Sequence, residues 1–265
     1  VPALLQTMIN DASLQNMDMS FVKCIITGGD VVSAELKTKV DKFMRERGSS
    51  ATVRPGYGLT EGSGASSFLP DKHQKLGSTG IPCQDCTYKI VDIETNKEVP
   101  ANTVGEILIS GPNVMLGYLN DPEETKKVLE KDKDNVVWLH TGDMGKMDKD
   151  GFVYFDGRLK RIIISSGYNL YPNHIESVII KHPMVEEVCV IGVDHPYKSQ
   201  VAKAFVVLKS GAREDTVRRE IKKLCLEYLA KYSQPYQIEF RSSLPRTNLG
   251  KIDYKQLERE EKEKK

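Results

Sequence analysis

The sequence lacks both an excess of one charge and any long apolar run. Its 38 lysines and arginines nearly balance its 37 acidic residues, which leaves a formal net charge of +1 over 265 residues. Nucleic-acid-binding domains usually concentrate basic residues, and a membrane-spanning helix needs about 20 consecutive apolar residues. The composition therefore disfavours a nucleic-acid partner and excludes a membrane span, although it does not determine the oligomeric state.

Cysteine is scarce and odd in number, which does not fit a disulfide framework. Five cysteines are present, and Cys189 is embedded in an apolar run. This usage indicates a reducing compartment, and we expect a cytoplasmic protein. Cys83 and Cys86 have the spacing of half a zinc site. No second pair of cysteines or histidines stands at a suitable distance, so we do not expect zinc.

Histidine is also scarce, and no nucleophile–base constellation is visible around any of the five histidines. General acid–base catalysis is therefore not implied. His140 directly precedes the motif Thr141-Gly142-Asp143.

The pattern of apolar and turn-forming residues divides the first 156 residues into two regions. Residues 1–70 read as α/β: residues 21–26 are an apolar strand candidate, and Ser33 can cap a helix that runs to about Glu46. From about 76 to 156, short strands are interrupted by Gly, Pro, Asn and Asp. That pattern is typical of an antiparallel sheet or a small barrel.

Past Gly157 the pattern predicts a separate α+β domain. We expect a helix at 172–181, strands at 186–193 and 201–208, and a second helix at 214–230. The overall fold class is therefore mixed, α/β followed by α+β.

Four short motifs carry the most specific chemistry. They are Tyr57-Gly58-Leu59-Thr60-Glu61, Thr141-Gly142-Asp143, Gly157-Arg158-Leu159-Lys160 and Pro245-Arg246-Thr247-Asn248-Leu249-Gly250-Lys251. In this order they resemble the adenylate-forming superfamily of acyl-CoA synthetases, nonribosomal-peptide adenylation domains and firefly-type luciferases. Such enzymes activate a carboxylic acid with ATP and pass the acyl group to an acceptor, usually a thiol. The resemblance covers essentially the whole chain.

The resemblance implies a domain plan. Residues 1–156 correspond to the C-terminal part of the large adenylate-forming domain, with a small antiparallel β-barrel from about residue 76. Residues 157–160 correspond to a hinge, and 161–265 to a small mobile α+β C-terminal domain. The family's phosphate loop, rich in Ser, Thr and Gly and closed by Lys, is not found here, and the sequence starts with Val1. We therefore expect the C-terminal part of a longer ligase.

Adenylation joins two anions, so its main requirement is to neutralise charge around the α-phosphorus. Glu61 is a candidate ligand for Mg²⁺, a hard ion that prefers oxygen. Thr60 can hydrogen-bond a phosphate oxygen, and Tyr57 offers an aromatic face for adenine. The resemblance assigns these roles to the same residues and places Gly58 beside them at the nucleotide.

The resemblance implies roles at the nucleotide for three further charged residues. The Asp143 carboxylate can accept hydrogen bonds from both ribose hydroxyls, and in the family this aspartate is assisted by the arginine that is Arg158 here, across a predicted hairpin. Lys251 carries a compact charge on a flexible stem, which can reach a phosphate and a carboxylate together. The matching family lysine bridges the substrate carboxylate and the α-phosphate.

The resemblance also implies domain rotation between two half-reactions. Lys160 occupies the pivot, where one or two residues must absorb the change in the backbone. Gly167 has no side chain where the pantetheine arm must pass. The run from Ser166 to Glu176 closely resembles bacterial fatty-acyl-CoA ligases. Ile164 stands where luciferases carry a lysine, which disfavours a luciferase.

The segment Gly28-Gly29-Asp30 matches a family segment near the acyl pocket. The family more often has a small residue where Asp30 stands, so the polarity of the pocket stays open. The acyl chain length and head group are not determined by the sequence.

We therefore predict an ATP-dependent acyl-CoA synthetase that acts through an acyl-adenylate, with ATP, AMP, Mg²⁺ and coenzyme A as ligands. A fatty acid or a related carboxylic acid would be the substrate. Two alternatives stay open. One is an adenylation domain that loads a carrier protein, and the other is an inactive fragment that binds nucleotide weakly or not at all.

Overall fold

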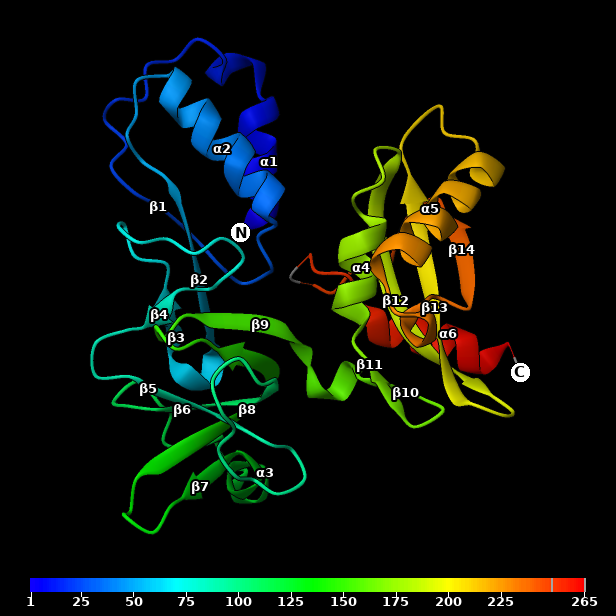
Figure 1. Cartoon of the computed structure of the whole chain (residues 1–265). Coiled ribbons are helices and arrows are strands. Elements are labelled where there is room, and N and C mark those ends of the chain that lie inside the picture. Colours follow the sequence, from blue (N-terminus) through cyan, green and yellow to red (C-terminus); the bar gives the residue numbers. More distant parts are fainter. Residues whose placement is uncertain (249, 265) are drawn as a thin grey trace. The chain divides into compact units, whose positions relative to one another are not determined.

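The computed structural model describes residues 1–248 and 250–264. The chain divides into two compact units, Val1–Phe155 and Asp156–Lys265 (Figure 1). Each unit has its own sheets and its own apolar core. Among the described residues, no helix combines the length and the apolar character that crossing a membrane requires.

A small sheet and two helices make up the N-terminal part of the first unit. The elements are α1 (Pro2–Asn10), η1 (Ala12–Leu14), β1 (Ile25–Thr27), α2 (Ala34–Glu46), β2 (Val53–Leu59), η2 (Thr60–Gly62), β3 (Gly64–Phe68) and β4 (Ile81–Pro82). The strand order is β1-β2-β3-β4, with β1 parallel to β2 and the other neighbours antiparallel. The two α-helices pack on each other and bury Val40 and Met44 beside Val53 of β2.

The predicted helix after Ser33 is confirmed, because the Ser33 side chain accepts a hydrogen bond of 3.1 Å from Leu36 N and α2 follows. The bounds of the predicted strand at 21–26 are wrong, since β1 begins only at Ile25. The residues before it form a turn in which Val22 N donates to Met19 O at 2.9 Å.

A five-stranded sheet forms the rest of the first unit. Its elements are β5 (Thr87–Val91), β6 (Gly105–Ser110), α3 (Pro122–Val128), β7 (Leu129–Lys131), β8 (Val137–Met147) and β9 (Val153–Arg158). The order is β5-β6-β8-β7, and β9 pairs with β8. The hydrogen-bonded order among the described strands is open, so the expected barrel does not close, whereas the mixed fold class is confirmed. All six residues of β6 are buried, and this strand runs through the centre of the core.

The second unit is a sheet covered by helices on both faces. Its elements are η3 (Leu159–Arg161), β10 (Ile163–Ser165), β11 (Tyr168–Leu170), α4 (Pro172–Ile179), β12 (Val185–His195), β13 (Ser199–Leu208), α5 (Glu214–Tyr228), η4 (Lys231–Ser233), β14 (Gln237–Arg241) and α6 (Tyr254–Glu263). The order is β11-β10-β13-β12, with β14 parallel to β13. The predicted strands and helices of this domain are confirmed to within a few residues at their ends.

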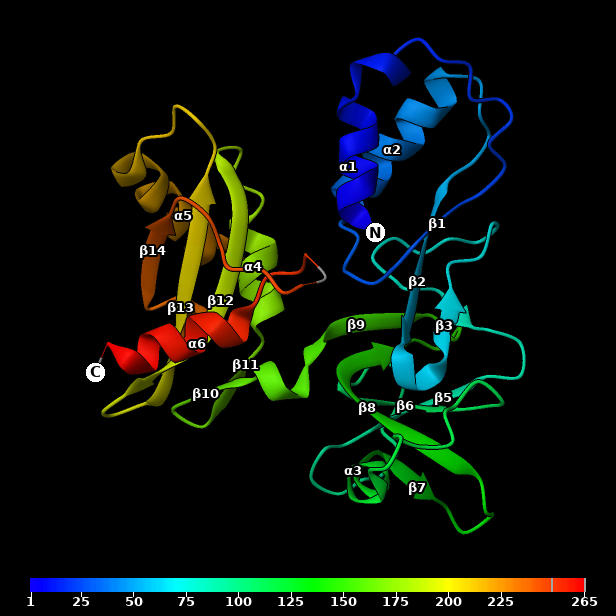
Figure 2. The same ribbon diagram turned by 180° about the vertical axis from the view of Figure 1, so that it is seen from behind.

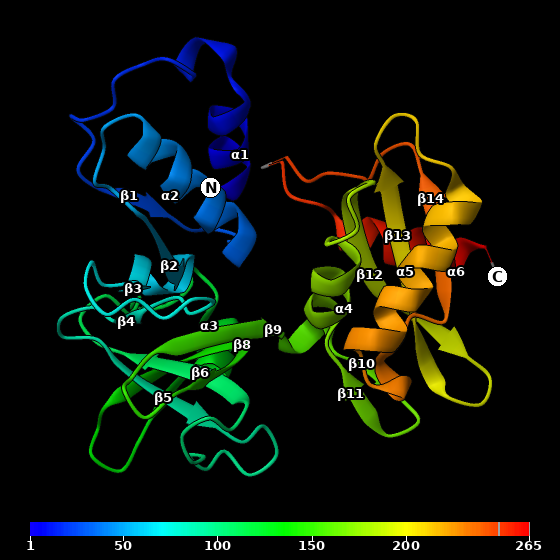
Figure 3. The same ribbon diagram turned by 45° about the horizontal axis from the view of Figure 1, so that its top comes forward.

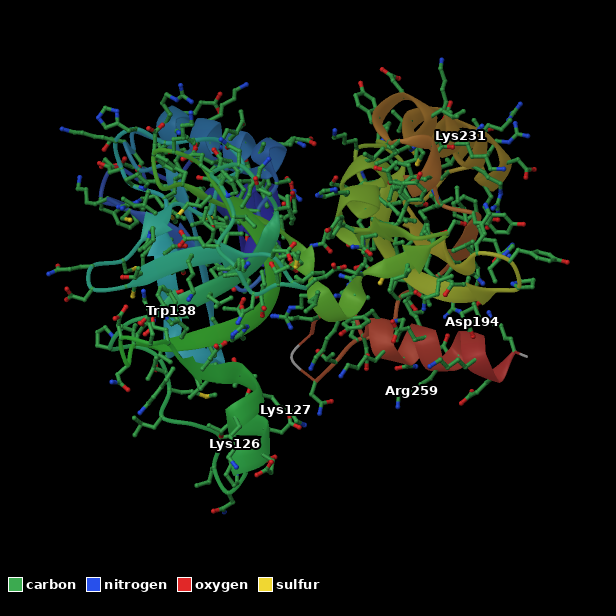
Figure 4. All side chains as sticks on the ribbon, turned by 60° about the horizontal axis from the view of Figure 1, so that its bottom comes forward. Lys126, Lys127, Trp138, Asp194, Lys231 and Arg259 are labelled. Carbon is green, nitrogen blue, oxygen red and sulfur yellow. The ribbon has the colours of Figure 1, made fainter. Side chains whose placement is uncertain are left out.

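Side-chain alternation along β13 explains the two covered faces. Ala204 and Val206 belong to the core beneath α4 and α5, whereas Phe205 and Val207 belong to the core that contains Leu257 of α6. Figures 1 and 3 show α4 and α5 over one face of this sheet, and Figure 2 shows α6 over the other. In Figure 4 the charged side chains of Lys126 and Lys127 on α3 and Arg259 on α6 project from the surface.

Candidate active site

Two residues that lie far apart in the sequence meet in the first unit. The Tyr57 hydroxyl of β2 donates a hydrogen bond of 2.8 Å to Asp143 Oδ2 of β8. Both residues are buried, with 8% and 3% of their surface exposed. Burial, followed by the charge of Asp143, raises the pKa of Tyr57 far above its usual range. The phenol therefore stays protonated and acts as a fixed donor to the carboxylate.

The Tyr57 ring is packed inside the protein. Its centroid lies 6.4 Å from that of Tyr88, edge to face, and 6.1 Å from that of Phe155. The Tyr88 hydroxyl is 2.5 Å from Ser66 Oγ, which also donates to Tyr57 O at 3.4 Å. These contacts restrict the orientation of the ring and keep the Tyr57 hydroxyl directed at Asp143.

Asp143 lies in a bulge of β8. Glu106 of β6 is opposite Met144, and Leu108 is opposite His140, so three residues of β8 face the single residue Ile107. Gly142 has φ of +66°, a conformation that residues with a side chain rarely adopt. The motif Thr141-Gly142-Asp143 is therefore this bulge, and the glycine permits its sharp backbone turn.

Side chains hold the bulge in place. Thr141 Oγ1 donates to Ile107 O at 2.6 Å and accepts from Asp143 N at 3.1 Å. Glu106 Oε1 accepts from Gly142 N at 2.9 Å. The Thr141 hydroxyl and the buried Glu106 carboxylate thus both stabilise the backbone of the bulge.

His140 connects two carboxylates behind the bulge. Its Nδ1 lies 3.0 Å from Glu106 Oε2, and its Nε2 lies 3.0 Å from Glu130 Oε2. The hydrogen bond with Glu106 raises the pKa of His140, burial opposes this, and Glu130 adds to the increase. Both ring nitrogens of His140 are therefore used in hydrogen bonds with carboxylates of this chain.

The motif after Tyr57 continues into η2. Gly58 lies so close to β3 that an added Cβ would be 1.9 Å from Gly64 O, which explains the glycine. Thr60 is exposed at the start of η2. The Glu61 carboxylate accepts a hydrogen bond of 2.7 Å from the Tyr118 hydroxyl, and this bond raises the pKa of Tyr118 to about 12.

The donor set at Glu61 limits how a metal ion can be held. Among the described residues, no group of three or more His, Cys, Asp or Glu side chains is arranged to hold a metal ion. Mg²⁺ often binds through one or two carboxylates together with phosphate oxygens and water. The single carboxylate of Glu61, which follows Thr60 in the sequence, fits that mode of binding and does not fit a cage made of protein ligands alone.

The two glycines proposed for the acyl pocket follow β1. Thr27 pairs with Pro55 in the parallel ladder, and a Cβ on Gly28 would lie 3.1 Å from Gly56 O. Gly29 has φ of +81°. The structure therefore places Gly28 next to the residue that precedes Tyr57, at the carboxyl end of a parallel strand, where ligands commonly bind in α/β sheets.

The remaining predicted residues belong to the second unit. Arg158 ends β9, Lys160 lies in η3, and both are exposed. Gly167 has φ of +83° in the turn between β10 and β11, and a Cβ there would meet no atom within 4 Å. This turn is open, as a passage for an extended ligand would require.

Lys251 is exposed on a tight loop. Thr247 N donates to Lys251 O at 2.8 Å, and Gly250 N donates to Thr247 O at 2.8 Å. Arg246 forms an ion pair with Glu187 and donates to Gly250 O at 2.8 Å. Leu249 of the predicted motif lies outside the described residues. The backbone of the loop is thus braced while the lysine side chain extends from it.

The structure joins some predicted residues and leaves others in separate units. Tyr57, Asp143 and Gly28 lie on neighbouring elements of the first unit, and Gly58, Thr60 and Glu61 follow Tyr57 directly. Arg158, Lys160, Gly167 and Lys251 belong to the second unit, and their positions are described within that unit only. Sequence reasoning missed Glu106 and Tyr118. The one available signal for Glu106 was an acidic residue within the apolar strand at 105–110.

Comparison with known proteins shows which family the chain resembles. The model of the AMP-binding enzyme family matches residues 1–119, and that of the AMP-binding enzyme C-terminal domain matches residues 174–251. A long-chain-fatty-acid–CoA ligase of Bacillus subtilis strain 168 is 38% identical over 264 residues, which cover 99% of this chain and 45% of that protein.

Solved structures give the same family. The ATP-bound MatB of Rhodopseudomonas palustris superposes with a TM-score of 0.86 and 30% identity, over 98% of this chain and 49% of that one. The o-succinylbenzoate CoA synthetase of Bacillus subtilis, in complex with an acyl-adenylate intermediate, has a TM-score of 0.81 and 31% identity, over 97% and 49%.

These matches define the class of protein. The chain belongs to the adenylate-forming superfamily of AMP-binding enzymes. It spans about half the length of the relatives and structures that it matches.

Proposed function

We propose that the chain is the C-terminal part of an ATP-dependent acyl-CoA synthetase. In the first half-reaction a carboxylate oxygen attacks the α-phosphorus of ATP, and pyrophosphate leaves. In the second, the thiol of CoA attacks the acyl carbon, the thiol proton is lost, and AMP leaves. The observation that supports this most strongly is the hydrogen bond from buried Tyr57 to buried Asp143, which fixes the carboxylate of the aspartate whose motif matches the family's ribose ligand.

The residues of the first unit bind and orient the nucleotide in this proposal. Asp143 accepts hydrogen bonds from the two ribose hydroxyls, and Tyr57 keeps the carboxylate in one orientation. Gly58 lets the backbone come close to the ligand, and Thr60 donates to a phosphate oxygen. Glu61 would hold Mg²⁺, which supplies positive charge to the phosphates when it is bound.

The residues of the second unit act in turn. We propose 1–156 and 161–265 as domains joined by a hinge at 157–160, with Lys160 as the pivot. Lys251 neutralises the charge between the attacking carboxylate and the α-phosphate, and Arg158 assists Asp143 at the ribose. After rotation, Gly167 provides the open backbone along which the pantetheine arm reaches the acyl-adenylate.

The substrate class is a fatty acid or a related carboxylic acid. The support is the name of the Bacillus subtilis relative, and Gly28 and Gly29 beside β2 are the proposed wall of the acyl pocket. We further propose a cytoplasmic location, since all five cysteines are free thiols.

The test joins residues 1–265 to the upstream half of the Bacillus subtilis relative, because the chain matches 45% of that protein. The chimera is incubated with ATP, Mg²⁺, CoA and a panel of carboxylic acids, and the products are identified by mass spectrometry. We expect acyl-CoA, AMP and pyrophosphate. AMP formation without a CoA ester would instead favour an adenylation domain that loads a carrier protein.

The 265-residue chain alone is the matched control. We expect it to show little or no ATP-dependent activity, because the backbone cradle for the triphosphate is proposed to come from the upstream half. Robust acyl-CoA formation by the chain alone would contradict this part of the proposal.

A further inference from the structure

Glu106 is an acidic residue in the most deeply buried strand of the first unit. Every residue of β6 is buried, and Glu106 itself is 8% exposed. A buried carboxylate is costly unless hydrogen bonds or an opposite charge compensate for the lost water. The sequence therefore retains a residue here that a sheet core alone would not favour.

Both carboxylate oxygens of Glu106 serve the bulge in β8. Oε1 accepts from Gly142 N at 2.9 Å, and Oε2 is 3.0 Å from Nδ1 of His140. Because three residues of β8 face one residue of β6, the ladder cannot supply a backbone acceptor for every N–H in the bulge. The Glu106 side chain takes the place of that missing acceptor.

The shape of the bulge determines where Asp143 lies. The backbone N–H of Asp143 donates to Thr141 Oγ1, and its carboxylate accepts from the Tyr57 hydroxyl of β2. Gly142 directly precedes Asp143, and its N–H is the backbone group that donates to Glu106. If the Gly142 N–H lost its acceptor, the backbone would turn towards another one and Asp143 would move away from Tyr57.

We propose that Glu106 is a positioning residue for nucleotide binding. By shaping the bulge it sets the affinity of Asp143 for the ribose hydroxyls, although it does not touch the nucleotide itself. This inference rests on the proposed function, in which Asp143 is the ribose ligand.

The test measures how well the chimera with the upstream half of the Bacillus subtilis relative distinguishes AMP from 2′,3′-dideoxy-AMP, which lacks both hydroxyls. Binding is followed by isothermal titration calorimetry, and thermal unfolding is recorded for each variant. Glu106→Met is preferred to alanine because it fills the same space without leaving a cavity. Glu106→Gln is the conservative variant, because its amide oxygen can still accept from Gly142 N.

We expect Glu106→Met to weaken AMP binding about tenfold, a loss on the scale of one hydrogen bond to a charged group. Binding of the dideoxy analogue should change less than about twofold, because it makes no ribose contact with Asp143. Glu106→Gln should restore most of the preference for AMP. Glu130→Gln is the matched control on the far side of His140, and it should leave the preference unchanged.

Other results would overturn the proposal in distinguishable ways. If Glu106→Met weakens both ligands equally, or neither, Glu106 has a structural role only. If the unchanged chimera binds AMP and the dideoxy analogue equally well, the ribose role of Asp143 is wrong and the proposed function loses its main support. Glu106→Asp keeps the charge but shortens the reach, so it should give the same selective loss, and it decides the matter if the methionine variant does not fold.

Discussion

Tyr57 and Asp143 of the first unit are held more firmly than the candidate residues of the second unit. In the first unit, Tyr57 and Asp143 are buried and hydrogen-bonded to each other. In the second unit, Lys160, Gly167 and Lys251 are exposed on short turns and loops. The proposed function gives this difference a meaning: one unit holds the nucleotide in a preformed geometry, whereas the other brings groups to it in turn.

The contrast has a physical basis in preorganisation. A buried carboxylate with a fixed donor does not need to reorganise when a ligand binds, which favours affinity. A lysine on an exposed loop keeps its freedom to approach and withdraw, which suits a group that is needed in only one of two steps. Substitutions should therefore affect different measurements in the two units.

The largest effect is expected for Lys251→Ala in the active chimera. Adenylate formation should fall by about 10²- to 10³-fold, the usual cost of losing one group that stabilises transition-state charge. Thioester formation from a preformed acyl-adenylate should be largely spared. Both steps can be followed by single-turnover kinetics, and Lys255→Ala, an exposed lysine on α6, is the matched control.

Equal loss in both half-reactions would remove Lys251 from this role. A lower melting temperature in the variant would also contradict the comparison, because an exposed side chain on a braced loop should contribute little to stability.

Asp143→Ala should weaken AMP binding by about 10- to 100-fold, since hydrogen bonds to a charged group are lost. It should also lower stability, because the buried Tyr57 hydroxyl loses its partner. Calorimetry with AMP measures the first effect and thermal unfolding the second. Asp150→Ala, an exposed aspartate on the same hairpin, should change neither by much.

Tyr57→Phe sharpens the comparison further. It removes only the donor that orients Asp143, so we expect a loss of about three- to tenfold in AMP affinity, as for one ordinary hydrogen bond. The ring contacts with Tyr88 and Phe155 remain. Affinity equal to that of the unchanged chain would mean that the Asp143 carboxylate is oriented by the bulge alone.

The smallest effect concerns the pH dependence of the second unit. Lys203 is buried and lies 2.7 Å from carboxylate oxygens of both Glu239 and Glu261. Burial raises the pKa of Glu239, but hydrogen bonds from Lys203 and Arg241 outweigh it and lower the pKa to about 2. A lowered pKa in the folded state stabilises the fold above the unfolded value, near pH 4.3, and this stabilisation is lost as the pH falls towards 2.

Lys203→Met tests this dependence through urea unfolding followed by circular dichroism. The stability difference from the unchanged chain should shrink by about 1 kcal/mol between pH 6 and pH 3. Lys264→Met is the matched control, because Lys264 contacts the same two glutamates from a half-exposed position. A difference that stays constant with pH would show that the buried pair has no linked titration.

Much of the fold was predictable because local signals agreed with the tertiary structure. Ser33 caps α2, and β5 and β6 are short runs rich in apolar and β-branched residues that turn-forming residues separate, as the sequence pattern predicted. Failures occurred where long-range contacts decide the outcome. The apolar residue Phe21 looked like part of a strand, yet it is 70% exposed in a turn that the sequence pattern does not mark.

The candidate site was predictable from its motifs and not from its supporting residues. Tyr57 and Asp143 stood out because each belongs to a recognisable string of residues. Glu106 and Tyr118 act through spatial neighbours, since Tyr118 reaches Glu61 across 57 positions of the chain. The bulge at Gly142 depends on the pairing register of β6 and β8, which no single strand reveals.

The Tyr57–Asp143 hydrogen bond also has a consequence for folding kinetics. It joins residues 86 positions apart, so the entropy of closing a long loop must be overcome before the bond can form. The Tyr57–Asp143 bond should therefore form late, after both sheets of the first unit have assembled. A ligand that binds only the folded chain stabilises it by mass action. If the proposed site is correct, AMP would therefore stabilise the fully folded state and not an early folding intermediate.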